Sequence, residues 1–235
     1  MSIKAAFIGL GAMGAPMAGH LHAKGLLVAV GNRSQARADA LANELGVKAP
    51  DLAGIAGSAD VIALCVSADA DVIGVVQALA PSLKKGSIVI DHSTVAPATA
   101  KRAARILAEV GAEFLDAPVS GGVEGAKNGK LSIMVGGDAA VLERARPVLE
   151  AYGARVTHMG AVGNGQATKA VNQVLVAGIA HAVTEGLALG EALGLEADSL
   201  IPTLSAGAAG NWFLDKRGAT MLRNEFSVGF KLALL

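Results

Sequence analysis

The chain has 235 residues, of which 52% are hydrophobic and 17% are charged, and its formal net charge is +0. This composition excludes an intrinsically disordered chain and indicates a well-packed globular protein with one large or two modest domains. Because no block of like charges occurs, neither nucleic acid nor an anionic membrane is expected as the main partner, and we expect a small molecule instead.

The first predicted elements are a strand over residues 3–8 and a helix after Gly11, joined by Gly9-x-Gly11-x-x-Gly14. Between a strand and a helix, such glycines permit a tight turn, let a pyrophosphate approach the backbone and let the helix pack closely on the strand. The free amides at the helix start would face the phosphates. The alternative is an ordinary turn in a glycine-rich chain. The sequence predicts a dinucleotide site formed by Gly9, Leu10, Gly11, Ala12, Met13 and Gly14.

Gly25 is expected to end this helix, and a second strand follows over residues 26–30. About twenty positions after the glycines, an acidic residue normally binds the adenosine ribose hydroxyls, but this chain has Asn32 followed by Arg33 and Ser34. Since a guanidinium pairs well with a phosphate, this difference favours NADP(H) as cofactor, with NAD(H) possible. The alternative is that Arg33 is simply exposed where Ser34 caps the next helix.

Apolar strands and amphipathic helices then alternate along the chain. We predict helices over residues 35–45, 72–79 and 98–110, and strands over residues 61–66, 87–91 and 114–117. This alternation specifies an α/β fold with a Rossmann-type, doubly wound parallel sheet.

Ligands of such sheets bind beyond the carboxyl ends of the strands, so residues 66–68, 92–94 and 118–122 are expected to face one cleft. We predict cofactor contacts for Val66, Ser67 and Thr94, although Ser93 and Thr94 are equally suited to cap the helix that follows. In Ser120-Gly121-Gly122, two glycines expose backbone amides beside a hydroxyl, which predicts a cradle for a carboxylate.

The remaining part of the sheet and the domain boundary are predicted from residues 128–193. Asn128-Gly129 predicts a tight turn before an antiparallel strand over residues 131–135, and Asp138 is expected to cap a helix that reaches about residue 151. A short strand at 154–157 ends the alternation, and one long helix at 166–193 precedes shorter helical segments. We therefore predict a dinucleotide-binding domain at 1–163 and an all-α substrate and oligomerisation domain at 164–235.

The long helix is apolar but is interrupted by polar side chains, so we expect a buried helix of a soluble protein and not a membrane span. Its alanines and glycines permit close helix packing, which suggests a homodimer or homotetramer. The interrupting residues are Asn172, Gln173, His181, Glu185 and Glu191.

A polar stripe of Gln166, Lys169, Asn172 and Gln173 lies near the start of that helix, at spacings of three and four residues. A lysine on a helix is usually solvated. Lys169, however, lies where the two domains join, and a lysine in a dry pocket can protonate a carbonyl oxygen as hydride arrives. We predict that Lys169 is the general acid/base and that Asn172 holds the substrate oxygen.

Cysteine and histidine usage bears on location and on metals. The single cysteine, Cys65, excludes an intrachain disulfide and fits a reducing compartment, and its apolar neighbours indicate a buried strand residue. Since the N-terminus also lacks a signal-peptide pattern, we expect a cytoplasmic protein. The five histidines show no metal-ligand spacing, so no metal is expected.

Three ordered motifs together resemble the β-hydroxyacid dehydrogenase family, which includes 3-hydroxyisobutyrate dehydrogenases and semialdehyde or glyoxylate reductases. The motifs are residues 9–14, residues 116–122 with the sequence DAPVSGG, and residues 163–172, where Gly-Asn-Gly leads into Lys169-x-x-Asn172. The resemblance covers essentially the whole chain. It implies that Ser120, Gly121 and Gly122 bind a substrate carboxylate, that Lys169 is the general acid/base, that Asn172 supports the substrate, and that Thr94 lies near the nicotinamide. Asn32-Arg33-Ser34 resembles the NADP-using members.

Two related families fit less well. The 6-phosphogluconate dehydrogenases carry a His-Asn-Gly signature after the lysine, whereas Lys169 is followed here by Ala-Val-Asn-Gln. Imine reductases share the glycine motif and an Asn-Arg turn but usually lack this lysine. An imine-reductase-like enzyme therefore remains an alternative of lower rank.

The resemblance also implies a Lys-Asp-Leu motif with another active-site lysine after a Phe-rich segment such as residues 226–230. The sequence stops at Leu235, before that motif, and Lys231 is too close to Phe230 to replace it. We expect a C-terminally truncated and therefore incomplete helical domain, in which residues 232–235 are covered by another subunit or form an exposed apolar patch.

The sequence as a whole predicts an oxidoreductase that transfers a hydride between NADP(H) and a small carboxylate-bearing aldehyde or β-hydroxyacid. The competing interpretation is a non-catalytic dinucleotide-binding oligomerisation module, which the absent second lysine allows.

Overall fold

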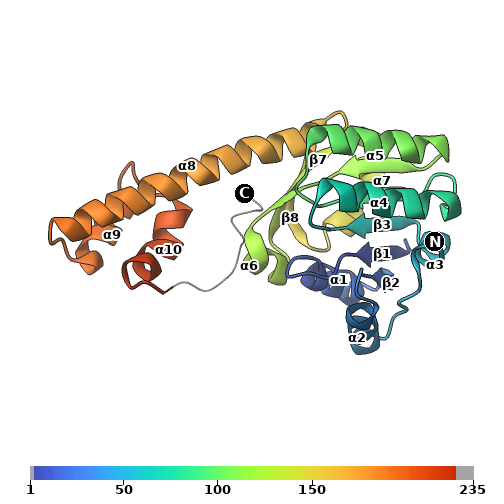
Figure 1. The fold of residues 1–235 in the computed structure, drawn as a ribbon, viewed down its shortest axis with the longest axis horizontal. Helices are drawn as coiled ribbons and strands as arrows, with labels where there is room; N and C mark the ends of the chain where they lie inside the picture. Colours follow the sequence, from blue (N-terminus) through green and yellow to red (C-terminus); the bar gives the residue numbers. More distant parts are fainter. Residues whose placement is uncertain (1–2, 226–235) are drawn as a thin grey trace. The chain divides into compact units, whose positions relative to one another are not determined.

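The computed structural model describes residues 3–225 and consists of two compact units, residues 1–169 and 170–235 (Figure 1). The boundary lies inside a helix, six residues beyond the predicted boundary at 163/164. The first turn of that helix belongs to the first unit because it is hydrogen-bonded to the sheet. The predicted features at residues 226–235, including Phe226, Phe230, Lys231 and Leu232 to Leu235, lie outside the described residues.

The first unit is built on one eight-stranded sheet, in which seven strands follow the order β2-β1-β3-β4-β5-β7-β6. The eighth strand, β8, also pairs with β7, in the parallel sense. Strands β1 to β5 are parallel, and β7 is antiparallel to β5 and β6. The prediction of a doubly wound α/β sheet with a later antiparallel strand is confirmed. The strands are β1 (Ala5–Ile8), β2 (Leu27–Gly31), β3 (Val61–Leu64), β4 (Ile88–Asp91), β5 (Glu113–Asp116), β6 (Val119–Ser120), β7 (Leu131–Gly136) and β8 (Gly153–Gly160).

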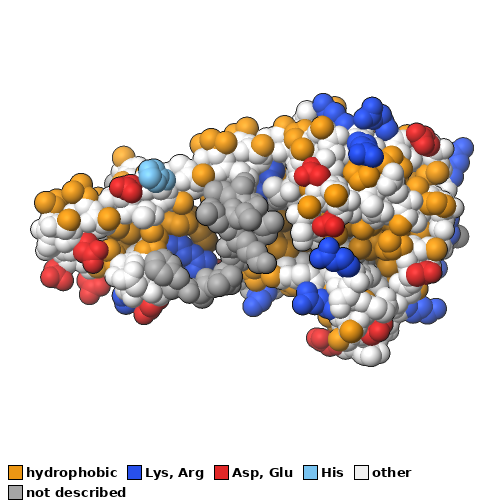
Figure 2. Space-filling view, in the orientation of Figure 1, with side chains coloured by type: hydrophobic (Ala, Val, Ile, Leu, Met, Phe, Trp, Pro, Cys, Tyr) orange, Lys and Arg blue, Asp and Glu red, His pale blue; other side chains and the backbone are white. Residues whose placement is uncertain are grey.

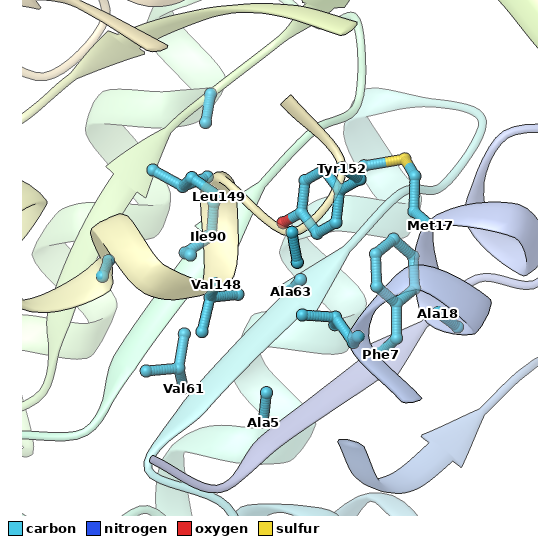
Figure 3. Close-up of a cluster of buried hydrophobic side chains, with 14 of the residues drawn as sticks. Ala5, Phe7, Met17, Ala18, Val61, Ala63, Ile90, Val148, Leu149 and Tyr152 are labelled. Atoms are coloured by element: carbon cyan, nitrogen blue, oxygen red, sulfur yellow. The ribbon is translucent and has the colours of Figure 1, made fainter. Parts of the chain in front are cut away.

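Helices cover both faces of this sheet, because successive strand residues point to opposite sides. In β1, Phe7 points into a core shared with helices α1, α2 and α7, whereas Ile8 points into a second core with α3, α4 and α5. Figure 3 shows the first core, where Phe7, Met17 and Tyr152 pack together. The helices are α1 (Gly14–Ala23), α2 (Gln35–Leu45), α3 (Leu52–Ser58), α4 (Asp69–Leu79), the 3₁₀ turn η1 (Ala80–Ser82), α5 (Pro97–Glu109), α6 (Gly122–Lys127) and α7 (Ala139–Leu149).

Several local predictions need correction. Helix α3 was not expected, although Asp51 caps it by accepting a hydrogen bond from the Gly54 amide. Asn128-Gly129 ends helix α6 and is not a hairpin turn. Neither Ser93 nor Thr94 caps α5, which begins at Pro97 with Ala96 at its N-cap position. Ser34 occupies the N-cap position of α2, but its side chain forms no capping hydrogen bond.

The second unit contains most of the long helix α8 (Asn164–Ala192), with α9 (Ala197–Ser205) and α10 (Trp212–Leu222). Close packing depends on glycines, since a Cβ atom at Gly190 would lie 2.6 Å from Leu200 and one at Gly218 would lie 3.3 Å from Ile201. Among the described residues of this unit, 170–225, only a few side chains are buried, Leu187 and Leu214 among them.

The expectation that α8 is a buried helix is wrong for the described chain. Val171 is 61% exposed and Val174 is 74% exposed, and Leu175, Ile179 and Leu189 are exposed as well. Apolar side chains are visible along this helix in Figure 2. By length and composition alone α8 could cross a membrane, a weak criterion that core helices also meet. These exposed side chains give the second unit a large apolar face.

Candidate active site

The glycine motif forms the turn between β1 and α1. Gly9 has a φ of +93°, and a Cβ atom there would overlap the carbonyl oxygen of Cys65. A Cβ atom at Gly14 would overlap the carbonyl oxygen of Gly9, so Gly14 lets α1 pack against the turn. Both glycines have the structural roles predicted for them. At Gly11 no atom lies within 4 Å of an added Cβ, so open space adjoins the backbone there.

The start of α1 presents unused hydrogen-bond donors. Its N-cap residue is Met13, which provides no side-chain acceptor, and among residues 3–225 nothing accepts a hydrogen bond from the amides of Ala12, Met13 or Gly14. Ala12 is exposed. Free amides and the positive end of the helix dipole suit an anionic ligand such as a diphosphate.

Asn32 at the end of β2 stabilises this turn. Its Oδ1 accepts a hydrogen bond from the Leu10 amide at 3.0 Å, and its Nδ2 donates to the carbonyl of Ser34 at 3.3 Å. The next side chain, Arg33, is 89% exposed, and its guanidinium lies 3.6 Å from the carboxylate of Asp71. Arg33 is therefore a solvent-facing cation beside the turn.

The carboxyl ends of β3 and β4 are joined by a hydrogen bond from the Val66 amide to the Ser93 hydroxyl, at 2.9 Å. Ser93 is buried, whereas Ser67 and Thr94 are exposed. The structure thus brings Val66, Ser67 and Thr94 to the same edge of the sheet as Gly9, whose added Cβ would lie 3.3 Å from Val66.

His92, beside this edge, is a core residue. Its ring nitrogens lie 2.7 Å from the carbonyl of Ala117 and 2.8 Å from the hydroxyl of Tyr152. Burial lowers the pKa of His92 to about 4 and raises the pKa of Tyr152. Both groups are therefore neutral near pH 7 and hold β4, β5 and β8 together.

Ser120, Gly121 and Gly122 form the junction of β6 and α6. Gly121 has a φ of +128° and Gly122 a φ of +60°, conformations that favour glycine. In the described part of the chain no group accepts a hydrogen bond from either glycine amide. Both glycines are exposed, so two amides and the Ser120 hydroxyl are available to a ligand. Nε2 of His20 in α1 lies 3.0 Å from the carbonyl oxygen of Ala126, which places α6 beside α1.

Lys169 lies at the end of the first unit, on the second turn of α8. It is half-buried, and burial lowers the pKa of its amine. Asn172, three residues farther along α8, is half-buried and its Nδ2 donates to Gln173 Oε1 at 3.0 Å. The predicted polar stripe thus contains one amine that is easier to deprotonate than an exposed lysine.

Sequence reasoning missed the roles of Gln166 and Asp116. Gln166 is buried and is bound to the loop after β4, so it is unavailable to a substrate. Asp116 accepts hydrogen bonds from the amides of Gly163 and Gln166. Since 47 and 50 residues separate these partners, no local sequence signal marks the interaction.

Comparison with known proteins identifies the family. Residues 4–160 match the family model described as the NAD binding domain of 6-phosphogluconate dehydrogenase, and residues 163–235 match that described as NAD-binding of NADP-dependent 3-hydroxyisobutyrate dehydrogenase. The chain belongs to the β-hydroxyacid dehydrogenase family. It is an NAD(P)-dependent oxidoreductase of the hydroxyacid dehydrogenase type, which acts on CH–OH groups.

Curated relatives of this β-hydroxyacid dehydrogenase cover most of the chain. The 2-hydroxy-3-oxopropionate reductase of Escherichia coli is 37% identical over 235 residues, which are 99% of this chain and 80% of the relative. The NAD-dependent L-serine dehydrogenase of Pseudomonas aeruginosa is 40% identical over 213 residues, which are 89% of this chain and 72% of the relative.

Solved structures of related proteins have the same fold as this chain. The 3-hydroxyisobutyrate dehydrogenase of Mycobacterium tuberculosis with L-serine has a TM-score of 0.89 at 33% identity, over 100% of this chain and 83% of that chain. Psf3 in complex with NADP+ and 2-OPP has a TM-score of 0.87 at 32% identity, over 98% and 82% of the two chains. An imine reductase from Myxococcus stipitatus, with 20% identity and a TM-score of 0.79, shares the fold alone.

Proposed function

We propose that this protein interconverts a small carboxylate-bearing aldehyde and the corresponding β-hydroxyacid with NADP(H), and that Lys169 is its general acid/base. The position of Lys169 carries the proposal: its amine is half-buried on the second turn of α8, and burial lowers the pKa of that amine, so it gives up a proton more readily than the amine of an exposed lysine. The relatives that are named after hydroxyacids or semialdehydes support the substrate class.

Each site residue has its own part in this reaction. The hydroxyl of Ser120 and the amides of Gly121 and Gly122 hold the substrate carboxylate. When bound, the cofactor supplies the hydride that reaches the carbonyl carbon. The ammonium of Lys169 gives its proton to the carbonyl oxygen, so the aldehyde becomes the alcohol, and in the reverse direction the Lys169 amine takes that proton back. Asn172 hydrogen-bonds the substrate.

The glycine turn is the proposed cofactor site. The diphosphate binds at the amides of residues 11–14, where the open space at Gly11 admits it. Val66, Ser67 and Thr94 contact the nicotinamide half, and Arg33 pairs with the 2′-phosphate of NADP(H). The relatives include an NAD-dependent enzyme and an NADP+ complex, so this preference rests on Asn32 and Arg33 of this chain.

Replacement of Lys169 by alanine tests the function. We expect turnover to fall by about 10²–10⁴-fold, the usual contribution of a general acid, while cofactor binding stays unchanged. The measurement is NADPH oxidation with a panel of semialdehydes and glyoxylate, together with NADPH binding by fluorescence. Lys24→Ala, at an exposed lysine after α1, is the matched control.

Wild-type turnover in Lys169→Ala would refute the catalytic role of the lysine. Cofactor binding by the wild-type protein without turnover on any aldehyde of the panel would instead support a non-catalytic binding module. The single reduced cysteine suits the cytoplasmic location that we propose for this enzyme.

A further inference from the structure

The start of α8 is capped by a residue from the sheet. Asp116, at the end of β5, is fully buried, and its Oδ1 accepts a hydrogen bond from the Gly163 amide at 2.7 Å. Its Oδ2 accepts one from the Gln166 amide at 2.9 Å. The first amides of a helix have no partner within the helix and are usually capped by a residue next to them in the chain. Here the cap comes from the end of β5, so it links the first turn of α8 directly to the sheet.

Gln166 adds a second attachment, on the side of β4. Its Oε1 accepts a hydrogen bond from the Val95 amide at 3.2 Å, and its Nε2 donates to the carbonyl of Ser93 at 2.7 Å. Because both ends of the amide group are used and the side chain is buried, Gln166 cannot move without breaking these bonds. Residues 93 and 95 flank Thr94, the proposed nicotinamide contact.

The backbone of α8 has little clearance at this point. A Cβ atom at Gly165 would overlap the carbonyl of Met134 and lie 2.6 Å from the carbonyl of Asp116, and one at Gly136 would lie 2.8 Å from the Gly165 amide. The first turn of α8 therefore lies directly against β5 and β7. Lys169 is three residues beyond Gln166, which is about 4.5 Å along the helix axis.

We propose that Asp116 and Gln166 are positioning residues for Lys169: they fix the first turn of α8 to the ends of β4 and β5, and so set the place of the amine relative to the loop that carries Thr94. This inference rests on the proposed function of Lys169. The two side chains touch neither substrate nor cofactor in this arrangement, and they act through the helix.

Gln166→Met tests the proposal, because methionine keeps the length and volume of glutamine but forms neither hydrogen bond. We expect the turnover number to fall about 10–100-fold, because small displacements of a catalytic group are costly, with the Kd for NADPH close to wild type. The melting temperature should fall as well, because the buried Val95 amide and Ser93 carbonyl lose their partners. The matched control is Thr168→Val, which removes the hydrogen bond from Thr168 to the carbonyl of Asn164 within the same helix and leaves the bonds to β4 and β5 in place. It should retain full turnover.

A double-mutant cycle with Lys169→Ala separates positioning from general damage. If Gln166 acts through Lys169, the substitution Gln166→Met will cause no further loss in the Lys169→Ala background. An equal loss in both backgrounds would overturn the proposal, as would unchanged turnover in Gln166→Met alone. Full activity of Lys169→Ala would instead refute the proposed function, a distinct result.

If turnover of Lys169→Ala is too slow to measure, the pH profile of turnover shows whether Gln166 positions Lys169 or only stabilises the fold. In Gln166→Met, the part of the pH–turnover curve that depends on the pKa of the Lys169 amine should move along the pH axis, because the environment of Lys169 changes. A profile that coincides with wild type while turnover falls would mean a structural role only, and the proposal would be wrong.

Discussion

Asp91 is a buried residue whose chemistry the proposed reaction does not use. Its Oδ1 accepts a hydrogen bond from the Ser93 amide, whereas its Oδ2 has no partner within the described chain. Burial raises the pKa of Asp91 to about 7, and the carboxylates of Asp116 and Asp69 act in the same direction. Burial, with Asp91 nearby, also raises the pKa of Cys65 to about 12, so this thiol is protonated near pH 7. Asp91 is therefore largely protonated below about pH 7 and loses its proton above that pH.

The raised pKa of Asp91 predicts a dependence of stability on pH. Between the unfolded value near 3.8 and the folded value near 7, the native state binds more protons than the unfolded state, so this residue's contribution is lost as the pH rises. Asp91→Asn keeps the acceptor for the Ser93 amide and removes the titration. We expect the urea midpoint of wild type, relative to that of the variant, to fall from pH 5 to pH 8. Parallel pH curves for the two proteins would contradict this.

At the residue scale, we propose that Arg33 and Asn32 decide the cofactor preference. Arg33→Ala should raise the KM for NADPH about tenfold or more and leave the KM for NADH unchanged, because only the 2′-phosphate loses a charge-assisted partner. Arg37→Ala, at an exposed arginine one turn along α2, should change neither value. Steady-state kinetics with both cofactors measures this. A strong preference of the wild-type enzyme for NADH would refute our assignment.

At the scale of elements, the sequence predicts those features of the structure that depend on residues close together in the chain. The alternating strands and helices and the roles of Gly9 and Gly14 follow from local pattern and sterics. Helix α3 was not predicted, because it has only seven residues and two of them are glycines. Asn128-Gly129 ends a helix as readily as it forms a turn. The functions of Asp116 and Gln166 depend on partners 47 to 73 residues away, which no local pattern reveals.

One face of helix α8 exposes large apolar side chains to solvent. Val171, Val174 and Leu175 have a spacing of three and four residues and so share one face of the helix, and each is at least 60% exposed. Contiguous apolar surface of this kind marks an interaction site. We propose that a second copy of this chain covers it, in a homodimer or a homotetramer built on such pairs.

Val174→Asp tests this proposal. A charge placed on a buried apolar interface is costly, so we expect the variant to be a monomer in light scattering while wild type is a dimer or a tetramer. Val110→Asp, at a partly exposed valine in the first unit, should leave the oligomeric state unchanged. A monomeric wild type, or a Val174→Asp variant with the wild-type mass, would contradict the proposal.

At the scale of the whole molecule, the two units differ in self-sufficiency. The first has two continuous cores on either side of its sheet, whereas the described part of the second buries few side chains. The two family models match residues 4–160 and 163–235, and a solved relative aligns with 100% of this chain. The proposed cofactor turn at residues 9–14 and the proposed carboxylate cradle at residues 120–122 lie wholly in the first unit, so we expect cofactor binding to be less sensitive than oligomer formation to changes in the second.

The cap on α8 also has a consequence for the order of folding. Asp116 meets amides 47 and 50 residues later in the chain, so the first turn of α8 gains its cap only after β4 and β5 have formed and loop closure has been achieved. A nascent or partly folded chain thus lacks the environment that lowers the pKa of Lys169. The lowered pKa of the Lys169 amine is therefore a property of the folded chain and not of helix α8 alone, because burial is its cause.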